Sequence, residues 1–161
     1  MKETLSLFAH YNVWANKLII DVLLGLDDEL LDKEIASSFS SLRKTVYHTW
    51  SAEYIWLQRM QQVEHPIWIE QSFTGSFEEA CNEWQKASEG LAAFVDDHED
   101  ERLRQVFEYY SILKKQSFTK PLSTTLLHVF NHSTYHRGQL VTMLRQAGVV
   151  TIPGTDLVNF A

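Results

Sequence analysis

Three histidines recur at every fourth position in residues 127–145, whose sequence is LHVFNHSTYHRGQLVTMLR. They are His128, His132 and His136, and the apolar residues around them repeat with a helical period. Because successive helical residues turn by about 100°, residues i and i+4 lie one above the other, and two such imidazoles can bind one metal ion. Ser133 follows His132, so the glutamate of an HExxH motif is missing and a zinc protease of that kind is not expected.

Two ligands on one helix are too few for tight binding, so at least one more ligand must come from another element. The candidates by residue type are His10, His48, His65 and the carboxylate of Glu53. Periodicity does not choose among them, because His48 falls between two apolar stripes of its own predicted helix. The spacing is equally compatible with histidines that only form hydrogen bonds in a core.

The helix that carries the histidines is predicted from Pro121 to Ala147, with proline in its first turn and Gly148 as a left-handed stop. Its core stripe consists of Leu126, Val129, Ser133, Leu140, Leu144 and Ala147. His136 lies on the shoulder of this stripe and His132 lies further round. A site made by that pair therefore opens at the edge of a bundle, with His128 behind it.

Three further helices are predicted from apolar residues at alternating spacings of three and four. The first covers about residues 2–26, and the second covers about residues 41–63 after a serine-rich cap. The third begins at a capping box formed by Ser76 and Glu79 and ends in the acidic sequence of residues 96–100. One polar residue, Asn12, interrupts the stripe of the first helix, and we expect it to hydrogen-bond in the core or to line a pocket.

The connections complete an all-α prediction, a four-helix bundle with one long crossover. Residues 67–75 (IWIEQSFTG) are too many for a tight turn and are expected to cross between the halves of the bundle. Residues 102–119 are rich in aromatic and β-branched side chains without a helical period, which indicates a short β-hairpin or an irregular crossing before the last helix. The apolar tail after Gly148 is expected to pack back on the bundle.

The second helix carries an additional aromatic stripe, made of Tyr47, Trp50, Tyr54 and Leu57. A helix that is apolar on two faces must bury both of them. We predict that this stripe meets a second subunit, which makes the protein a homodimer. The alternative is that both stripes belong to the internal core.

Composition limits the classes of function. The chain of 161 residues is predicted to be one domain over residues 1–161, and its net charge of −7 argues against a nucleic-acid partner. No basic segment leads into an apolar run at the start, and no apolar stretch approaches about 20 residues, so we expect a cytoplasmic protein with no membrane partner. The lone Cys81 is expected to be a small buried hydrophobic residue rather than a nucleophile.

The sequence resembles the DinB family of damage-inducible, bundle-shaped metalloenzymes over nearly its whole length. The specific segment is HVFNHSTYHRGQLVTMLRQAG at residues 128–148. Supporting segments are YNVWAN at 11–16, SFSSLRKTVYHTWSAEYIWLQR at 38–59 and TDLVNF at 155–160. The resemblance implies a four-helix bundle, commonly dimeric, that binds a divalent metal.

Matched residue by residue, the resemblance implies the ligand set His48, His132 and His136, with His128 as a neighbour. The implied metal is Zn²⁺ or Ni²⁺, with Fe²⁺ or Mn²⁺ as further options. Three neutral imidazoles leave the full charge on the ion and leave positions free, as in catalytic sites. Such an ion lowers the pKa of a bound water or deprotonates a thiol.

The implied reaction is transfer of a low-molecular-weight thiol, of the bacillithiol type, to a small electrophile, because characterised relatives use such thiols. The alternatives are a metal-dependent hydrolase on the same three histidines and a non-catalytic dimeric module in which the metal only stabilises the fold. Asn12, Glu53, Tyr135 and Gln139 are candidates for orienting an imidazole or a substrate. Arg137 points about 100° away from His136, so we expect it to form an external salt bridge.

Overall fold

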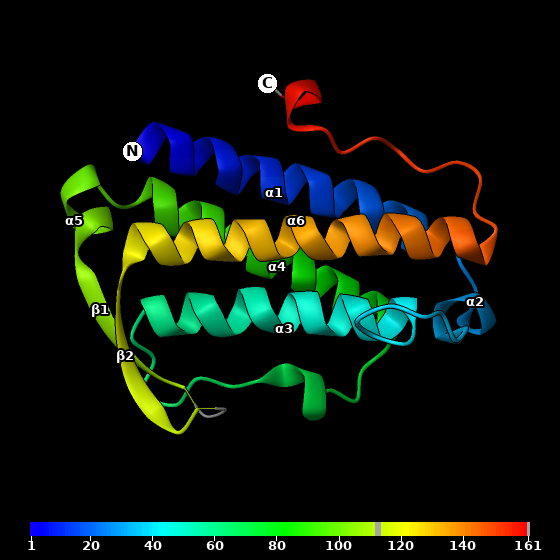
Figure 1. Ribbon diagram of the computed structural model, residues 1–161, viewed down its shortest axis with the longest axis horizontal. Helices are drawn as coiled ribbons and strands as arrows, with labels where there is room; N and C mark the ends of the chain where they lie inside the picture. Colours follow the sequence, from blue (N-terminus) through cyan, green and yellow to red (C-terminus); the bar gives the residue numbers. More distant parts are fainter. Residues whose placement is uncertain (112–113, 161) are drawn as a thin grey trace.

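The computed structural model describes residues 1–111 and 114–160. Its four long helices are α1 (Lys2–Leu23), α3 (Leu42–Met60), α4 (Phe77–Asp96) and α6 (Leu122–Ala147). Helices α1 and α3 each pack against both α4 and α6, so they face each other across the diagonal of the bundle. In Figure 1, α1 and α6 run from left to right and α3 and α4 run from right to left. The predicted four-helix bundle is confirmed.

The predicted long crossover is also present. Because α3 and α4 are parallel neighbours, the segment 61–76 between them must travel back along the length of α3. It does so below α3 in Figure 1 and contains the short 3₁₀ helix η1 (Ile69–Gln71). At the right-hand end of the bundle in Figure 1, a short helix α2 (Asp28–Asp32) and an irregular loop join α1 to α3.

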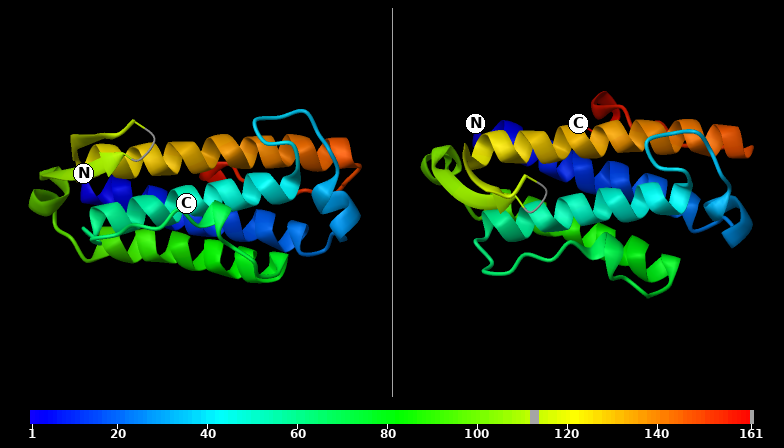
Figure 2. Two further views of the ribbon diagram at one scale, coloured as in Figure 1. Left: turned by 90° about the horizontal axis from the view of Figure 1, so that it is seen from below. Right: turned by 60° about the horizontal axis from the view of Figure 1, so that its bottom comes forward.

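A β-hairpin precedes the last helix, as predicted. Strands β1 (Val106–Ser111) and β2 (Gln116–Pro121) are antiparallel, with Val106 opposite Pro121. Residues 112 and 113 of the predicted hairpin segment lie outside the described residues. Figure 2 shows the hairpin at the N-terminal end of α6.

The start of the segment predicted as strand or irregular structure is helical instead, because α5 covers Asp100–Arg104. Acidic residues in its first turn and arginines in its last turn complement the helix dipole, a local signal that outweighs the β-type composition that follows.

Local capping explains where the long helices begin and end. The Oγ of Ser41 accepts a hydrogen bond from the backbone N–H of Lys44, and Ser76 and Glu79 form the predicted capping box. Helix α6 ends at Gly148, which has a left-handed φ of 96°. Helix α1 ends three residues earlier than the predicted Leu26, at Leu23.

Helix α3 ends before the predicted residue 63 for a visible reason. Gln62 adopts a positive φ of 58°, and the backbone N–H of Val63 donates to the carbonyl of Gln58. This left-handed termination stops the helix at Met60 and redirects the chain into the crossover.

The tail packs back on the bundle, as expected. The hydroxyl of Tyr11 donates to the backbone carbonyl of Thr155 at 2.6 Å. The ring of Phe160 lies 5.6 Å from that of Trp14, next to the short helix η2 (Leu157–Asn159). Ala161 lies outside the described residues. No helix in the described part of the chain is long and apolar enough to cross a bilayer.

The aromatic stripe of α3 packs largely within the chain, with Trp50 and Leu57 buried and Tyr47 and Tyr54 half-buried. Trp50 is 3% exposed and its ring lies 5.0 Å from that of Phe73 in the crossover segment. The ring of Tyr47 contacts Phe73 and Phe77. The crossover segment and the start of α4 thus cover much of the stripe, which favours the internal alternative, and contact with a second subunit stays a prediction.

The core consists of two apolar clusters separated by a polar layer. One cluster gathers residues such as Ile19, Trp50 and Leu140, and the other gathers residues such as Leu5 and Val129. Between them, every long helix contributes fully or almost fully buried polar side chains. These are Asn12 and Asn16 of α1, Glu53 of α3, Ser88 of α4, and Ser133 and Arg137 of α6.

The carboxylate of Glu53 is the acceptor at the centre of this layer. Its Oε1 accepts from Asn12 at 3.0 Å, from Asn16 at 2.9 Å and from Ser133 at 2.7 Å, and its Oε2 accepts from Ser88 at 2.7 Å. Because a buried carboxylate must be satisfied by donors, this cluster requires all four helices to meet at one level.

Arg137 supplies the positive charge of the layer. It is 2% exposed, and its guanidinium donates to Asn16 Oδ1 at 2.8 Å, to Asn12 Oδ1 and to Thr134 at 2.9 Å. The prediction of an external salt bridge is thus wrong. Helix α6 packs against both α1 and α3, so its buried arc is wider than the single stripe read from the sequence.

Replacing Arg137 with methionine should lower the free energy of unfolding by about 3 kcal/mol or more. The change leaves amide oxygens unpaired and a buried carboxylate without its nearby cation. Urea denaturation measures the loss. Arg145→Met, at an exposed arginine of the same helix, is the control and should change stability by about 0.5 kcal/mol or less. Equal unfolding free energies for the two variants would contradict the proposed role of Arg137.

Candidate metal centre

Three imidazoles from two antiparallel helices converge in the groove between α3 and α6. His48 comes from α3, and His132 and His136 come from consecutive turns of α6. The Nε2 atom of His132 lies 3.4 Å from Nε2 of His48 and 3.1 Å from Nε2 of His136. The three candidate ligand atoms all lie within 4.8 Å of one another. The structure thus brings together the set implied by the resemblance.

These separations fit a shared cation. Zinc–imidazole bonds of about 2.0–2.1 Å at tetrahedral angles place two ligand nitrogens about 3.3 Å apart. The observed values of 3.1 and 3.4 Å lie on either side of that distance. Three neutral nitrogen lone pairs would repel one another at this range, and a cation between them removes the repulsion.

The surroundings keep the imidazoles neutral. Burial lowers the pKa of His132 to about 3, and the neighbouring His136, His48 and His128 reinforce the shift. Burial likewise lowers the pKa of His136 and, against the opposing attraction of Glu70, the pKa of His48. Only neutral imidazole binds a metal, so the pocket favours the binding form of each ligand.

In His48 and His136 the Nδ1 atom, which faces away from the cluster, has a hydrogen-bonding partner. The Oε2 atom of Glu70 lies 3.3 Å from Nδ1 of His48, and Oε1 of Gln139 lies 2.8 Å from Nδ1 of His136. The Nε2 of Gln139 in turn donates to Ser38 Oγ at 2.6 Å. With Nδ1 protonated and donating, Nε2 is left as the lone-pair donor, which is the tautomer a metal ligand needs.

Aromatic side chains form the walls of the centre. The ring of Phe39, from the loop before α3, stacks on His48 at 4.2 Å and lies 5.7 Å from His136. Trp68 of the crossover segment lies 5.9 Å from His48. Sequence reasoning did not single out Phe39, Trp68 or Glu70, because all three lie in irregular segments where no periodicity assigns a direction to a side chain.

Gln139 and Tyr135 lie beside the ligands, as the sequence suggested, but in different ways. Gln139 orients an imidazole directly. Tyr135 is 57% exposed, its ring lies 5.0 Å from that of His136, and its hydroxyl lies 3.4 Å from Ser38 Oγ. His128 is a neighbour, with its ring 6.0 Å from that of His132 and 5.5 Å from that of Trp56.

Two other candidates lie away from the ligands. Asn12 and Glu53 were expected to orient an imidazole or a substrate, yet in the described chain their hydrogen bonds go to the buried polar layer and not to an imidazole. That expectation is corrected: of the two roles considered for Asn12, the structure has the core hydrogen bond. The donors that a buried carboxylate needs lie inside the bundle, whereas the histidines lie at its edge.

The alternative third ligands also lie elsewhere. His10 lies 2.8 Å from Asp96, and His65 is 90% exposed next to Glu64. Cys81 is fully buried, and burial raises the pKa of its thiol to about 12, so it is the inert hydrophobic residue that was expected.

The donor set suits a borderline divalent ion such as Zn²⁺ or Ni²⁺, because imidazole binds both. It contains no anionic ligand, so the ion would keep its full charge. A site with three protein ligands also keeps at least one position for a small molecule, unlike a closed structural zinc site.

Comparison with known proteins agrees with this arrangement. The family model described as "DinB family" matches residues 1–161. Protein DinB of Bacillus subtilis (strain 168) is 31% identical over 160 residues, which cover 89% of this chain and 86% of that protein.

Two solved structures share the fold. A DinB-like protein from Bacillus cereus ATCC 10987 superposes with a TM-score of 0.69 at 23% identity, covering 90% of this chain and 91% of that chain. YfiT from Bacillus subtilis, described as a probable metal-dependent hydrolase with an unusual four-helix bundle topology, gives a TM-score of 0.69 at 14% identity. That match covers 93% of this chain and 91% of the YfiT chain.

Metal content should depend on the three converging histidines and not on their neighbour. His48→Ala and His132→Ala should lose bound metal after purification, whereas His128→Ala, one turn away on the same helix, should keep it. Glu70→Gln should retain the fold but weaken metal binding by about 10-fold to 100-fold, because it removes the charge that orients His48. Elemental analysis and competition with a chelating dye measure these changes. Loss of metal in His128→Ala alone would show that the ligand set is wrong.

Stability of the metal-free protein should fall on acidification. The ordinary pKa of histidine is about 6.5, and in the fold that of His132 is about 3, so the unfolded chain binds more protons between these values. Stability is therefore retained above about pH 6.5 and is lost as the pH falls toward 3. Urea midpoints at pH 7.5 and pH 5, measured with EDTA, should drop more for the wild type than for His132→Gln. Equal drops would contradict the low pKa.

Proposed function

Since the chain belongs to the DinB family, we propose that it is a divalent-metal-dependent enzyme whose metal is held by His48, His132 and His136. The observation that carries this proposal is the convergence of three Nε2 atoms from α3 and α6, with the other ring nitrogens of His48 and His136 facing Glu70 and Gln139. A closed structural site would need a fourth protein ligand, and the described residues around the cluster supply none.

For the reaction, we propose transfer of a low-molecular-weight thiol, such as bacillithiol, to a small electrophile. A divalent ion bound here supplies a Lewis acid that lowers the pKa of a thiol placed on it. The protein residues hold and shield the reacting sulfur. Gln139, fixed by Ser38, holds His136 in position, and the rings of Phe39 and Trp68 limit access of water from the side of His48.

A cavity next to the centre can receive the electrophile. It has a volume of about 310 Å³ and is bordered by Tyr135, Gln139 and Met143 of α6 and by Ser37 of the loop before α3. Tyr135 and Gln139 both border the cavity and lie beside His136, and they offer a hydroxyl and an amide to a polar group. Thiol transfer requires only an activated sulfur and an electrophile, so the reaction needs no further acid or base beside the metal centre.

Hydrolysis at the same centre is the second candidate, and one residue favours it. Glu70 is a partly exposed carboxylate beside His48, where it could accept a proton from an attacking water. The description of YfiT as a probable metal-dependent hydrolase with this fold supports the same reading. A non-catalytic role for the metal is the third candidate.

We further propose that the protein acts in the cytoplasm as a homodimer, as the sequence suggested. Trp50 and Leu57 of the aromatic stripe are buried within the chain, so of that stripe only Tyr47 and Tyr54 retain surface for a dimer contact.

The activity is tested with purified protein, bacillithiol and monobromobimane, in parallel with panels of esters and amides. We expect metal-dependent formation of the bimane conjugate, abolished by EDTA, restored by Zn²⁺ or Ni²⁺ and lost in His132→Ala. Glu70→Gln, assayed at saturating metal because it binds the ion more weakly, separates the two enzyme reactions, since it should then reduce hydrolysis far more than thiol transfer. Conjugation that persists unchanged in EDTA, with no ester or amide cleavage, would exclude both enzyme functions.

A further inference from the structure

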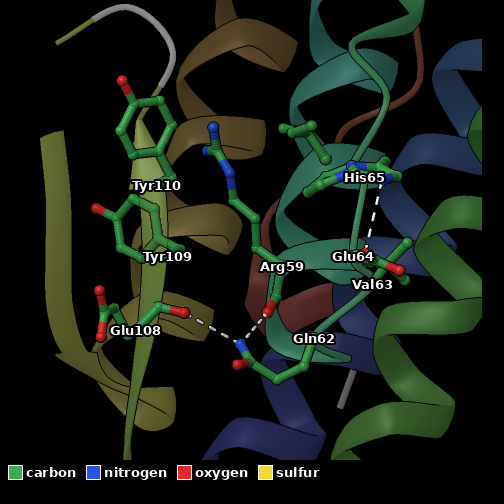
Figure 3. Close-up of a pocket in the computed structure, with 10 residues that line it drawn as sticks. Arg59, Gln62, Val63, Glu64, His65, Glu108, Tyr109 and Tyr110 are labelled. Atoms are coloured by element: carbon green, nitrogen blue, oxygen red, sulfur yellow. Dashed lines mark hydrogen bonds and ion pairs between the residues drawn. The ribbon is translucent and has the colours of Figure 1, made fainter. Parts of the chain in front are cut away.

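A second cavity lies at the other end of α3, between the helix terminus, the start of the crossover segment and strand β1. Its volume is about 480 Å³, and its lining includes Arg59, Gln62, His65 and Tyr109. In Figure 3 the Arg59 side chain extends between Tyr109 and Tyr110 on one side and the segment that carries His65 on the other. The Nε2 of Gln62 donates to the backbone carbonyl of Glu108 at 3.1 Å and so ties the hairpin to the helix.

The guanidinium of Arg59 is held in place by rings. Its Cζ lies 4.7 Å from the ring centre of Trp56 and 5.2 Å from that of Tyr109. Within residues 1–111 and 114–160 the guanidinium donates no hydrogen bond and forms no ion pair, and its Nε is buried without a partner. Burial also lowers the pKa of Arg59, which agrees with a cation that lacks a nearby carboxylate.

This arrangement contrasts with the other well-ordered arginines. Arg43 is paired with Asp28 and Asp32, and the two terminal nitrogens of Arg137 donate to amide oxygens and a hydroxyl, although its Nε, like that of Arg59, has no partner. A planar guanidinium that packs against two touching aromatic rings is restrained, and its free edge donors match a bidentate anion. Arg59 is therefore preorganised for an anion that the described protein does not supply.

The surroundings favour a carboxylate over a phosphate. Glu64 and Glu108 lie at the rim, and a dianion would be repelled by them, whereas one guanidinium balances one negative charge. In Figure 3 the carboxylate of Glu108 points away from Arg59 and leaves its donors accessible. Ile55, Val63, Pro66 and the tyrosine rings give the lining an apolar part, which can contact the body of a ligand.

A row of rings leads from this cavity to the metal centre. The ring of Trp56 lies 5.5 Å from that of His128, which lies 6.0 Å from that of His132. Arg59 and His48 are about three turns apart on α3, about 16 Å along the helix axis. A small molecule bound at both places must therefore be elongated and pass over the rings of Trp56 and His128.

We infer that Arg59, which packs against the rings of Trp56 and Tyr109, binds the carboxylate of the small molecule on which the metal centre acts. The binding of a carboxylate stands on the cavity alone, and the identification of that molecule as substrate rests on the proposed function. The cavity then selects substrates with an anionic end and places their other end toward the histidines.

The test measures binding by NMR on full-length ¹⁵N-labelled protein, through the indole N–H of Trp56, assigned among the five tryptophans with Trp56→Phe. The probes are 4-phenylbutyrate, its neutral amide and inorganic phosphate. We expect 4-phenylbutyrate to shift the Trp56 signal and to bind at least about tenfold more tightly than the amide or phosphate. Arg59→Gln should weaken binding of 4-phenylbutyrate by about tenfold or more, because a charged hydrogen-bonded pair is lost. Arg59→Lys should weaken it less, since the charge remains without the fork.

Matched variants separate this inference from the proposed function. Arg145→Gln removes an exposed arginine elsewhere and should bind the probe as the wild type does. His132→Ala lacks the metal centre and should also bind normally, so the carboxylate site is measured independently of activity. Unchanged binding in a folded Arg59→Gln protein, equal binding of the acid and its amide, or tighter binding of phosphate would each overturn the inference. Loss of binding in His132→Ala would place the probe on the metal instead.

Discussion

The structure depends on one buried carboxylate. Glu53 lies in the middle of the bundle with no solvent exposure, and it receives four hydrogen bonds from α1, α4 and α6. A carboxylate in that position is tolerated only if every donor is present, so the helices must meet at one level and in one rotation. Arg137 completes the layer by holding the amide oxygens of Asn12 and Asn16, whose nitrogens face Glu53. The two apolar clusters on either side could pack in more than one register, whereas this layer accepts a single one.

The same constraint positions the metal centre. Ser133 and Arg137 each follow a metal-binding histidine by one residue on α6, so the hydrogen bonds that turn them inward place His132 and His136 at the edge that faces α3. On α3, Glu53 points into the bundle while His48, more than a turn earlier, faces the groove. The polar layer inside the bundle and the three-histidine site at its edge are therefore positioned by the same helix rotations. The buried charges lie inside the bundle, and the three imidazoles at its edge are neutral. The crossover segment supplies Glu70 to this site, and the loop before α3 supplies Phe39 and Ser38, which accepts a hydrogen bond from Gln139.

The bundle topology explains why irregular segments matter so much here. Because α3 and α4 are parallel, their connection must pass along the outside of α3, and it brings Trp68 and Glu70 to the metal centre on the way. The same segment and the hairpin before α6 enclose Arg59 at the far end of α3. Helix α3 thus presents a candidate metal ligand, His48, near its start and Arg59 near its end, with Trp56 of α3 and His128 of α6 between them. The chain belongs to the DinB family. The cavity at Arg59 is completed by the crossover segment and the hairpin, which lie outside the four long helices.

Much of this molecule follows from local sequence rules. Helical periodicity, the capping box at Ser76, the serine cap of α3 and Gly148 define the long helices, because each signal acts within a few residues. The i, i+4 pair of His132 and His136 likewise follows from helix geometry alone. The third ligand does not, since His48 was chosen by family resemblance and only the packing of α3 against α6 brings it within 3.4 Å of His132. Tertiary structure also decided that Arg137 is buried, that the crossover segment covers Trp50 of α3, and that Glu70 reaches His48. In each case the deciding contacts join residues far apart in the chain, and local periodicity contains no information about which helix or loop covers a given face.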